Sequence, residues 1–409
     1  MDIRAFVEGL VSFESTAGNE AEVASWFEKR LAEFGFETYT WEADAEALAG
    51  HPSFPDDPAA IDAAGRPSVG GVLELGSSEG PTVVLNGHYD VVPADGTEWS
   101  SPPFEPTWDG DELTARGAAD MKSGLAACVY AALALEDRDV DGRVVVEGVA
   151  GEEDGGLGAA TAARSNPYPF ERDAAIIAEP TALTPVVASE GSVMMRLTME
   201  GRSAHAATPW RGVDVVETFA AVREAFFALE RERTARIDHP LYEGFPRPWP
   251  VVCGTVDAGA WASMVPAGLT AEWRIGVAPG ETVEEVETAF RARLDEVVAD
   301  DEWLTAHPPT FERFSVQFEP SEIAPDESIV EAVRAALRAD DRDHAPAGVT
   351  YGADARHYID AGIPTVLFGP GSIEQAHFPD ETVDFRAVEQ ARDCIADAVA
   401  AYFARYPEK

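Results

Sequence analysis

A histidine and an aspartate close the apolar stretch Val83–Leu85, in the run Leu85-Asn-Gly-His88-Tyr-Asp90. In an extended chain, side chains two residues apart point to the same side, so His88 and Asp90 would share one face. An imidazole that binds a metal needs a partner for its second ring nitrogen, and a carboxylate two residues on can supply it. The run therefore indicates a metal ligand, although a surface histidine beside a turn would have the same sequence.

A second acid, Asp120, lies in the run Arg116-Gly-Ala-Ala-Asp120-Met-Lys-Ser-Gly124. The apolar pattern of Ser123–Leu135 predicts a helix directly after it. A short acid before a helix is a good N-cap, because its side chain accepts a hydrogen bond from the first turn. Taken alone, this run favours an N-cap over a metal ligand.

Three consecutive acids, Glu152, Glu153 and Asp154, follow the apolar stretch Val144–Val146 and are bounded by glycines. Mutual repulsion raises the pKa of neighbouring carboxyls and disfavours their burial unless a cation compensates. A solvated acidic loop is the alternative, and such loops are common in an acidic chain. The preceding strand favours a functional role, because open α/β sheets bind ligands beyond the carboxyl ends of their strands.

Two further donors follow apolar stretches. Glu179 ends Ala174–Ala178, and His377 follows Thr365–Phe368 and a glycine-rich bend. Five segments that each offer a histidine or a carboxylate are hard to explain by core packing. Two divalent ions can share one carboxylate at a separation of about 3.5–4 Å, and zinc accepts mixed nitrogen and oxygen ligands. The three cysteines are too far apart for a disulfide framework or a thiolate site, and Cys128, in an apolar run, is expected to be buried.

Four of these runs together resemble the M20 metallopeptidases, which include acetylornithine deacetylase, succinyl-diaminopimelate desuccinylase, aminoacylase and carboxypeptidase G. The runs follow the family's order over nearly the whole chain: Gly87-His-Tyr-Asp-Val-Val-Pro, Arg116-Gly-Ala-Ala-Asp-Met-Lys-Ser-Gly, Gly151-Glu-Glu-Asp-Gly-Gly and Ala376-His-Phe-Pro-Asp-Glu. The resemblance implies a hydrolase of amide bonds with two zinc ions per subunit, for which cobalt or manganese are alternatives.

The resemblance also implies a role for each metal donor. Asp120 resembles the bridging ligand of the two ions. His88 and Glu179 resemble the remaining protein ligands of one zinc ion. Glu153 and His377 resemble those of the other. The family also tends to have a cis peptide after the bridging aspartate.

Three further residues resemble the groups that handle the proton and the oxyanion. Asp90 resembles the partner that orients His88. Glu152 resembles the general base that takes a proton from the bridging water and passes it to the leaving nitrogen. His205, in Gly201-Arg-Ser-Ala-His205-Ala-Ala, resembles the histidine that reaches a partner subunit's active site and stabilises the oxyanion. A surface residue at a helix start is the alternative for His205.

Two arginines are candidates for binding a substrate carboxylate. Arg356 lies where members of the family often place such an arginine, and a guanidinium fork suits that task. Arg274 lies on a strand whose register differs from the family's. The remaining histidines are expected to be surface or structural residues: His51, His239, His307, His344 and His357.

The elements that must position these residues alternate between strands and helices. Apolar strands such as Val83–Leu85 and Val144–Val146 are separated by helical patterns such as Ser123–Leu135. This alternation predicts an α/β domain with a largely parallel, buried sheet flanked by helices. Near the N-terminus, helical spacing before Gly35 predicts a helix from four apolar residues: Val23, Phe27, Leu31 and Phe34.

The middle of the chain has a different pattern and predicts a small inserted α+β domain. It combines alternating strands with helical stretches: Met194–Met199, Val213–Leu229, Leu269–Val277 and Thr282–Val298. We expect residues 1–186 to form the first part of the catalytic domain, 187–320 the insert, and 321–409 the second part. In the family the insert serves as lid and dimer interface, which implies a homodimer. The segment His51–Gly71 is expected to be a loop of unknown role.

The charge balance excludes some classes of partner. The chain has 74 acidic and 30 basic residues, for a formal net charge of −44, and only three of its bases are lysines. Acids are spread along the whole chain rather than gathered in an acidic binding tail, so the composition favours a halophilic protein, whose charges molar salt would screen. Nucleic acids and anionic membranes are poor partners for this surface. The sequence shows no membrane span and no secretory signal, so a cytoplasmic protein is expected.

Several substrates fit this interpretation. An N-acyl amino acid is the first choice, as for acetylornithine deacetylase or succinyl-diaminopimelate desuccinylase, and a dipeptidase or carboxypeptidase is the alternative. A non-catalytic relative would lack Glu152 or a ligand, and none is missing here. A phosphoesterase is disfavoured, because a net charge of −44 repels polyanions.

Overall fold

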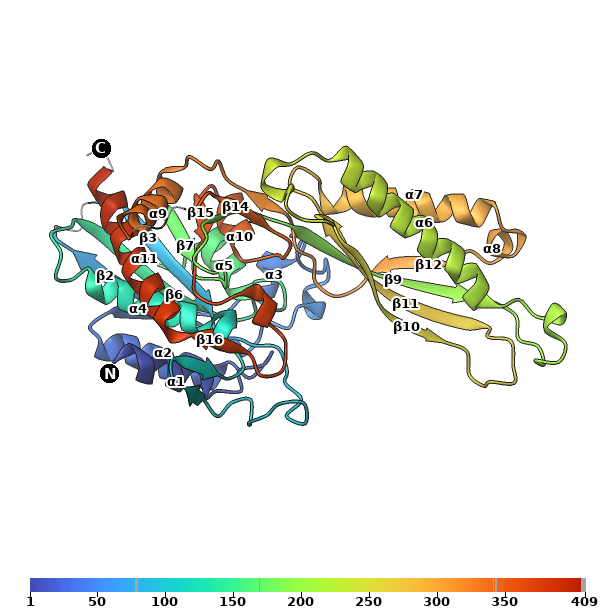
Figure 1. The fold of residues 1–409 in the computed structure, drawn as a ribbon, viewed down its shortest axis with the longest axis horizontal. Coiled ribbons are helices and arrows are strands. Elements are labelled where there is room, and N and C mark those ends of the chain that lie inside the picture. Colours follow the sequence, from blue (N-terminus) through green and yellow to red (C-terminus); the bar gives the residue numbers. More distant parts are fainter. Residues whose placement is uncertain (78–79, 169, 341, 343, 406–409) are drawn as a thin grey trace. The chain divides into compact units, whose positions relative to one another are not determined.

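The computed structural model describes residues 1–77, 80–168, 170–340, 342 and 344–405 (Figure 1). The chain divides into two compact units. The first comprises Met1–Val187, Ser321–Ala347 and Ala353–Lys409, and the second comprises Ala188–Pro320 and Gly348–Gly352. Among the described residues, no helix combines the length and the hydropathy that a membrane crossing requires.

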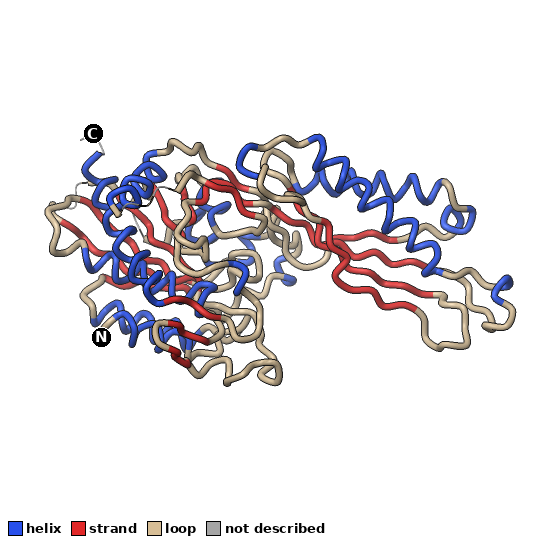
Figure 2. Tube along the Cα trace, viewed as in Figure 1, coloured by secondary structure: helices blue, strands red, loops and turns tan. Residues whose placement is uncertain are grey.

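A mixed sheet forms the centre of the first unit (Figure 2). Its strand order is β1-β2-β6-β3-β7-β15-β8-β13, and β14 pairs with β8. The bounds are β1 (Glu37–Trp41), β2 (Ser68–Leu75), β3 (Thr82–His88), β6 (Gly142–Val149), β7 (Ala174–Ile177), β8 (Val186–Ser189), β13 (Ser321–Glu322), β14 (Ala347–Val349) and β15 (Thr365–Leu367). The four central strands β6, β3, β7 and β15 are parallel, whereas β1, β2 and β8 pair antiparallel. The predicted α/β fold with a largely parallel sheet is confirmed.

Helices flank this sheet. They are α1 (Ile3–Val11), α2 (Ala21–Glu33), α3 (Ala45–Leu48), α4 (Ser123–Ala134), α5 (Leu157–Ser165), α9 (Ser328–Ala339), α10 (Ala355–Asp360) and α11 (Phe385–Arg405). α4 packs on β3 and β6, and α11 packs on α4 and α9, as Figure 1 shows. The predicted helix before Gly35 is α2, and the φ of Gly35 is 95°, a value that favours glycine after a helix end. Cys128 is buried in α4, as expected.

The segment expected as a loop over His51–Gly71 is shorter in the structure. Its last residues, from Ser68 on, belong to β2, which pairs antiparallel with β6. The prediction was wrong there because the small residues in Ser-Val-Gly-Gly have weak strand propensity, and pairing with a buried strand outweighs that weakness. The rest of the segment packs on α5 through a small apolar cluster: Leu48, Phe54, Ile61, Ala63, Leu157 and Ala160.

The second unit contains a four-stranded sheet in the order β10-β11-β9-β12. Its elements are β9 (Gly191–Glu200), α6 (Val215–Arg236), β10 (Val251–Ala258), β11 (Gly268–Val277), α7 (Val283–Ala299), α8 (Glu302–Ala306) and β12 (Thr310–Arg313). The helices α6 and α7 lie side by side over one face of this sheet (Figure 1). The alternating residues of β9 and β11 supply the sheet side of their shared core.

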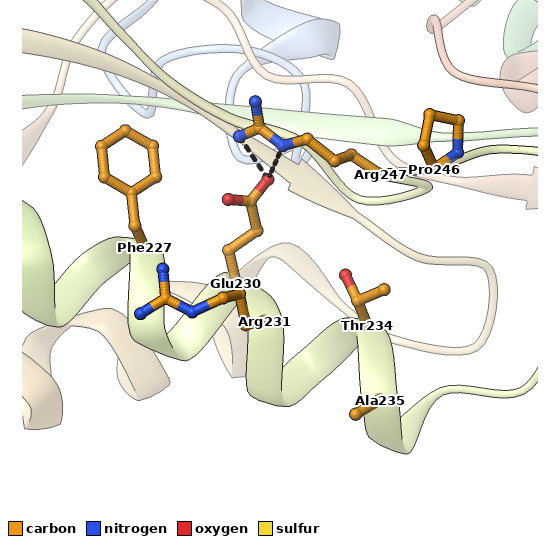
Figure 3. Close-up of a pocket in the computed structure, with 7 residues that line it drawn as sticks. All are labelled: Phe227, Glu230, Arg231, Thr234, Ala235, Pro246 and Arg247. Atoms are coloured by element: carbon orange, nitrogen blue, oxygen red, sulfur yellow. Dashed lines mark hydrogen bonds and ion pairs between the residues drawn. The ribbon is translucent and has the colours of Figure 1, made fainter.

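A pocket of about 510 Å³ lies beside α6 (Figure 3). Its lining residues are Phe227, Glu230, Arg231, Thr234, Ala235, Pro246 and Arg247. The Glu230 carboxylate accepts hydrogen bonds from Arg247 Nε at 2.8 Å and from the Val251 backbone N–H at 3.0 Å. These bonds fasten the segment before β10 to the helix.

One short segment groups differently from the sequence-based division. We expected all of 321–409 to belong to one part, but Gly348–Gly352 groups with the second unit. The reason is local hydrogen bonding. The Val349 carbonyl accepts from Glu190 N–H at 2.9 Å and from Tyr242 Oη at 3.1 Å.

Candidate active site

The predicted donors gather at one edge of the parallel sheet. His88 is the last residue of β3 and is in register with Val149, the last residue of β6. Glu152 and Glu153 follow β6, and Glu179 follows β7. Because the carboxyl ends of parallel strands lie at the same edge, these side chains converge there.

Five donors form two groups that share one aspartate. His88, Asp120 and Glu179 make up one group, and Asp120, Glu153 and His377 make up the other. Within each group the ligand atoms lie within 4.8 Å of one another. The structure thus brings together all five residues that the sequence analysis selected as ligands, and Asp120 belongs to both groups.

The two oxygens of Asp120 face different histidines. Oδ1 lies 3.1 Å from His88 Nε2, and Oδ2 lies 3.7 Å from His377 Nε2. His377 Nε2 also lies 3.2 Å from Glu153 Oε1. A carboxylate oriented in this way can ligate two ions at once.

Asp120 does not cap a helix. It lies in the turn Ala118–Lys122 with φ −120° and ψ 99°, and the N-cap of α4 is Lys122. The Asp120–Met121 peptide is cis, as the family resemblance implied. Metal ligation therefore accounts for the acid better than the N-cap alternative.

A buried glutamate, Glu381, holds the turn that carries Asp120. One of its oxygens accepts from the N–H groups of Ala119 at 2.8 Å and Asp120 at 3.0 Å. The other accepts from Arg116 Nη1 at 2.8 Å and Gly117 N–H at 3.1 Å. Glu381 was not predicted to be a site residue, although it lies in the same run as His377. All four hydrogen bonds join residues more than 260 positions apart. The only signal in the sequence was that Glu381 lies close to His377 along the chain.

His88 is oriented mainly by a backbone carbonyl. Its Nδ1 lies 2.9 Å from the Asp90 carbonyl oxygen and 3.7 Å from Asp90 Oδ1. Since a carbonyl only accepts, Nδ1 carries the hydrogen and Nε2 is left to bind a metal. The expected partner was the Asp90 carboxylate, which instead accepts from the Glu153 N–H at 3.0 Å through Oδ2. Asp90 thereby contacts one member of each donor group, His88 through its carbonyl and Glu153 through its carboxylate.

The carboxylates of the cluster repel one another. Burial is the main cause of a raised pKa at Glu152, Glu153 and Glu179, and nearby negative charges add to it. At Glu152 the largest of these charges is that of Asp354, which is 1% exposed and which the sequence analysis also missed. Such a set is stable in its charged form only beside cations, and its nitrogen and oxygen donors fit zinc.

Removal of metal should make the stability of this protein fall as pH rises. Burial raises the pKa of Glu152, Glu153 and Glu179, so above 4.5 these three carboxyls bind more protons in the folded state than in the unfolded state. Asp120, whose pKa is lowered by its hydrogen bond to His88 against the effect of burial, opposes them only at lower pH. Stability then decreases with pH until those raised pKa values are passed. His88, whose pKa is raised above 6.5 by its hydrogen bond to Asp120 against the effect of burial, acts in the same direction.

Thermal melts of chelator-treated protein at pH 5, 6, 7 and 8 test this expectation. Added zinc should make the melting temperature depend less on pH, because zinc and protons compete for the same carboxylates. Glu179→Gln should reduce this pH dependence in the metal-free state. A metal-free melting temperature that rises with pH would contradict the proposed electrostatics.

The comparisons with known proteins agree with this geometry. Residues 84–401 match peptidase family M20/M25/M40. An acetylornithine deacetylase from Erwinia tasmaniensis is 31% identical over 325 residues, which cover 78% of this chain and 79% of that protein. The chain belongs to peptidase family M20/M25/M40. It is therefore a hydrolytic enzyme of the metallopeptidase and amidohydrolase type.

Solved structures of M20 proteins share the fold. A metallo-carboxypeptidase of the family from Sulfolobus solfataricus has a TM-score of 0.76 at 16% identity, with 99% of this chain and 100% of that chain covered. A dinuclear metal-binding peptidase of the family from Bacillus subtilis has a TM-score of 0.63 at 16% identity, with 98% of each chain covered.

The two arginines predicted to bind substrate have protein partners in this M20 enzyme. Arg356 is 3% exposed and donates to the carbonyls of Ala353 at 2.8 Å and Gly155 at 2.7 Å. These bonds use two of the five N–H groups of the guanidinium, so a substrate carboxylate would share the side chain with them. Arg274 lies in the second unit, and its Nη2 is 3.3 Å from Glu190 Oε2.

His205 belongs to the second unit of this M20 enzyme and is exposed. Its Nδ1 accepts from the Ala207 N–H at 3.0 Å, which leaves Nε2 as the donor nitrogen. The cluster of donors described above comes entirely from the first unit, so His205 is not one of its members.

Proposed function

We propose that this M20 enzyme is a di-zinc hydrolase of the amide bond in N-acyl amino acids, of the acetylornithine deacetylase or succinyl-diaminopimelate desuccinylase type. The observation that carries the proposal is the sharing of Asp120 between two groups of donors. The substrate class is supported by the 31% identity to an acetylornithine deacetylase. The cytoplasmic location stays a prediction from the sequence.

His88, Glu179 and Asp120 would hold one ion, and Asp120, Glu153 and His377 the other. Zinc suits these donors, and cobalt or manganese are alternatives. When bound, such ions polarise a substrate carbonyl and lower the pKa of a water molecule. In the second group, the Glu153 N–H bond to Asp90 and the main-chain bonds of Glu381 hold the ligands in place.

Glu152 is suited to be the general base. It belongs to neither group of donors, so its carboxylate is left to exchange protons. It is 7% exposed, and burial raises its pKa, so the carboxyl can hold a proton between two transfers. Glu152 would take the proton of the attacking water and deliver it to the leaving nitrogen.

A panel of substrates in molar KCl tests the reaction. The panel holds N-acetylornithine, N-succinyl-diaminopimelate, other N-acyl amino acids and dipeptides, and amine release is measured with the zinc-loaded enzyme. Turnover of an acyl amino acid that is lost in Glu152→Gln supports the proposal. Turnover of dipeptides alone would move the enzyme to the peptidases of the family. Arg356→Lys tests the predicted carboxylate contact through KM.

A homodimer through the second unit is part of the proposal, with His205 completing the partner's site. Large apolar side chains are exposed on this unit: Trp210, Val216, Val252, Val256, Trp261 and Met264. Two of them lie on β10, an edge strand of the sheet. Exposed apolar residues on an edge strand are the usual features of an interface.

Val256→Asp on β10 should therefore dissociate the dimer and lower activity, because His205 would no longer reach a partner's site. We expect a dimer Kd at least about tenfold higher, measured by sedimentation. Ala292→Asp adds the same charge to an exposed position of α7 and should leave the dimer intact. A wild-type monomer with full activity would exclude this part of the proposal.

The halophilic character predicts that salt stabilises the protein. With a net charge of −44, raising KCl from 0.1 M to 1 M shortens the Debye length from about 10 Å to about 3 Å. We expect the melting temperature to rise across this range, more than in sucrose of equal osmolality. A melting temperature that does not change with KCl would contradict a halophilic adaptation.

A further inference from the structure

An arginine from the segment 51–67 contacts the acidic turn at residues 152–155, which follows β6 in the candidate site. Arg66 is 3% exposed. Its Nε lies 2.8 Å from Glu20 Oε1, and its Nη2 lies 2.9 Å from Asp154 Oδ2. Glu20 is 0% exposed, so it provides a buried anchor for the arginine. Arg66 therefore ties the third acid of the turn to the interior of the first unit.

The same segment also contacts the groups that hold the other end of the turn. The Gly155 carbonyl accepts from Arg356 Nη2 at 2.7 Å and from His357 Nε2 at 3.0 Å. The Phe54 ring stacks on His357 with an angle of 10° between the planes. Ser53 Oγ lies 3.5 Å from Arg356 Nε. The turn is thus held on both sides by contacts that involve residues 51–67.

Glu152, the candidate base, and Glu153, a metal donor, directly precede Asp154, so fixing Asp154 also restricts their positions. We propose that residues 51–67 clamp the turn, and that Arg66 is a positioning residue that orients Glu152 and Glu153 through Asp154. This inference rests on the proposed function for the role of Glu152. For Glu153, the inference depends only on the observation that this residue belongs to a donor group.

The chemistry of arginine explains why this residue type suits the position. Its guanidinium reaches two carboxylates at once, those of Glu20 and Asp154, in fixed directions. A lysine would keep the charge but lose that fork. Arg66 and Glu20 are both buried, so this pair fixes the guanidinium in place. The Asp154 side chain is 42% exposed, so its pair with Arg66 contributes direction more than stability.

Zinc binding by calorimetry tests the clamp independently of turnover. Asp154→Asn removes the charge of the clamped acid and leaves the Arg66–Glu20 pair intact, so the fold is expected to persist. Arg66→Lys tests the fork. Asp62→Asn is the matched control. Asp62 is an exposed acid of the same segment, and its backbone carbonyl, rather than its carboxylate, contacts Arg66.

We expect Asp154→Asn and Arg66→Lys to weaken one of the two zinc sites by about 10-fold, the lower end of the range for loss of a group that supports a ligand, because both residues act through the chain and not on a donor atom. In an active enzyme kcat should fall by a similar factor while KM changes little. Wild-type zinc affinities in both variants, with melting temperatures near that of the wild type, would overturn the clamp. Weakened zinc binding in variants of a wild type that turns over no substrate would instead support the clamp and reject the proposed function.

Discussion

Glu152→Gln should retain both metal ions and lose about 10²–10⁴-fold in kcat, the usual contribution of a general base. The reason is that Glu152 lies beside the two donor groups without belonging to either. Glutamine has nearly the same shape but cannot accept the proton of the attacking water. Metal content and kcat are measured on the same preparation.

The neighbouring residue provides the control for this variant. Glu153→Gln makes the same chemical change one position along the chain, at a member of a donor group. We expect it to lose affinity for one metal ion, and to lose activity for that reason. If Glu152→Gln lost metal and Glu153→Gln retained it, the two roles would have to be exchanged.

Asp120→Asn should have the second large effect, the loss of both metal sites. Each Asp120 oxygen faces a different histidine, so a single substitution weakens both groups. The stabilisation by metal should disappear with it. At a metal concentration of 100 times Kd, one site contributes about 2.7 kcal/mol to the free energy of unfolding.

A ligand that belongs to only one donor group provides the control for Asp120→Asn. His377→Ala removes a residue that belongs only to the second group. It should leave one metal ion per subunit, measured by elemental analysis after dialysis. Equal losses in Asp120→Asn and His377→Ala would contradict the sharing of Asp120.

Part of the fold could be predicted because local pattern and tertiary context agree. Buried parallel strands need apolar side chains on both faces, and Val144–Val146 of β6 has them. The helix after Thr282 was predictable for a similar reason, since Thr282 and Glu285 form a capping box that is local in sequence. The strand β2 was not predictable in its first half, because only its pairing with β6 outweighs the weak propensity of Ser68–Gly71.

The candidate site shows the same division. Residue types and positions after strands nominated His88 and His377, whereas the run around Asp120 taken alone favoured an N-cap. The family resemblance was needed to select Asp120 as a shared ligand. The orientation of His88 was not predictable. Its nearest partner is a carbonyl at 2.9 Å, and every residue has a carbonyl.

The sequence by itself determined the family, the α/β class and the candidate donors, because these depend on which residues occur and in what order. Only the tertiary structure decided which groups surround them. Glu381 accepts bonds from a turn more than 260 positions away, and Arg66 reaches Asp154 from another segment. Arg356 donates a hydrogen bond to the carbonyl of Gly155, 201 positions away. A charged side chain takes whatever partners the packed chain brings near it, and local sequence does not encode that proximity.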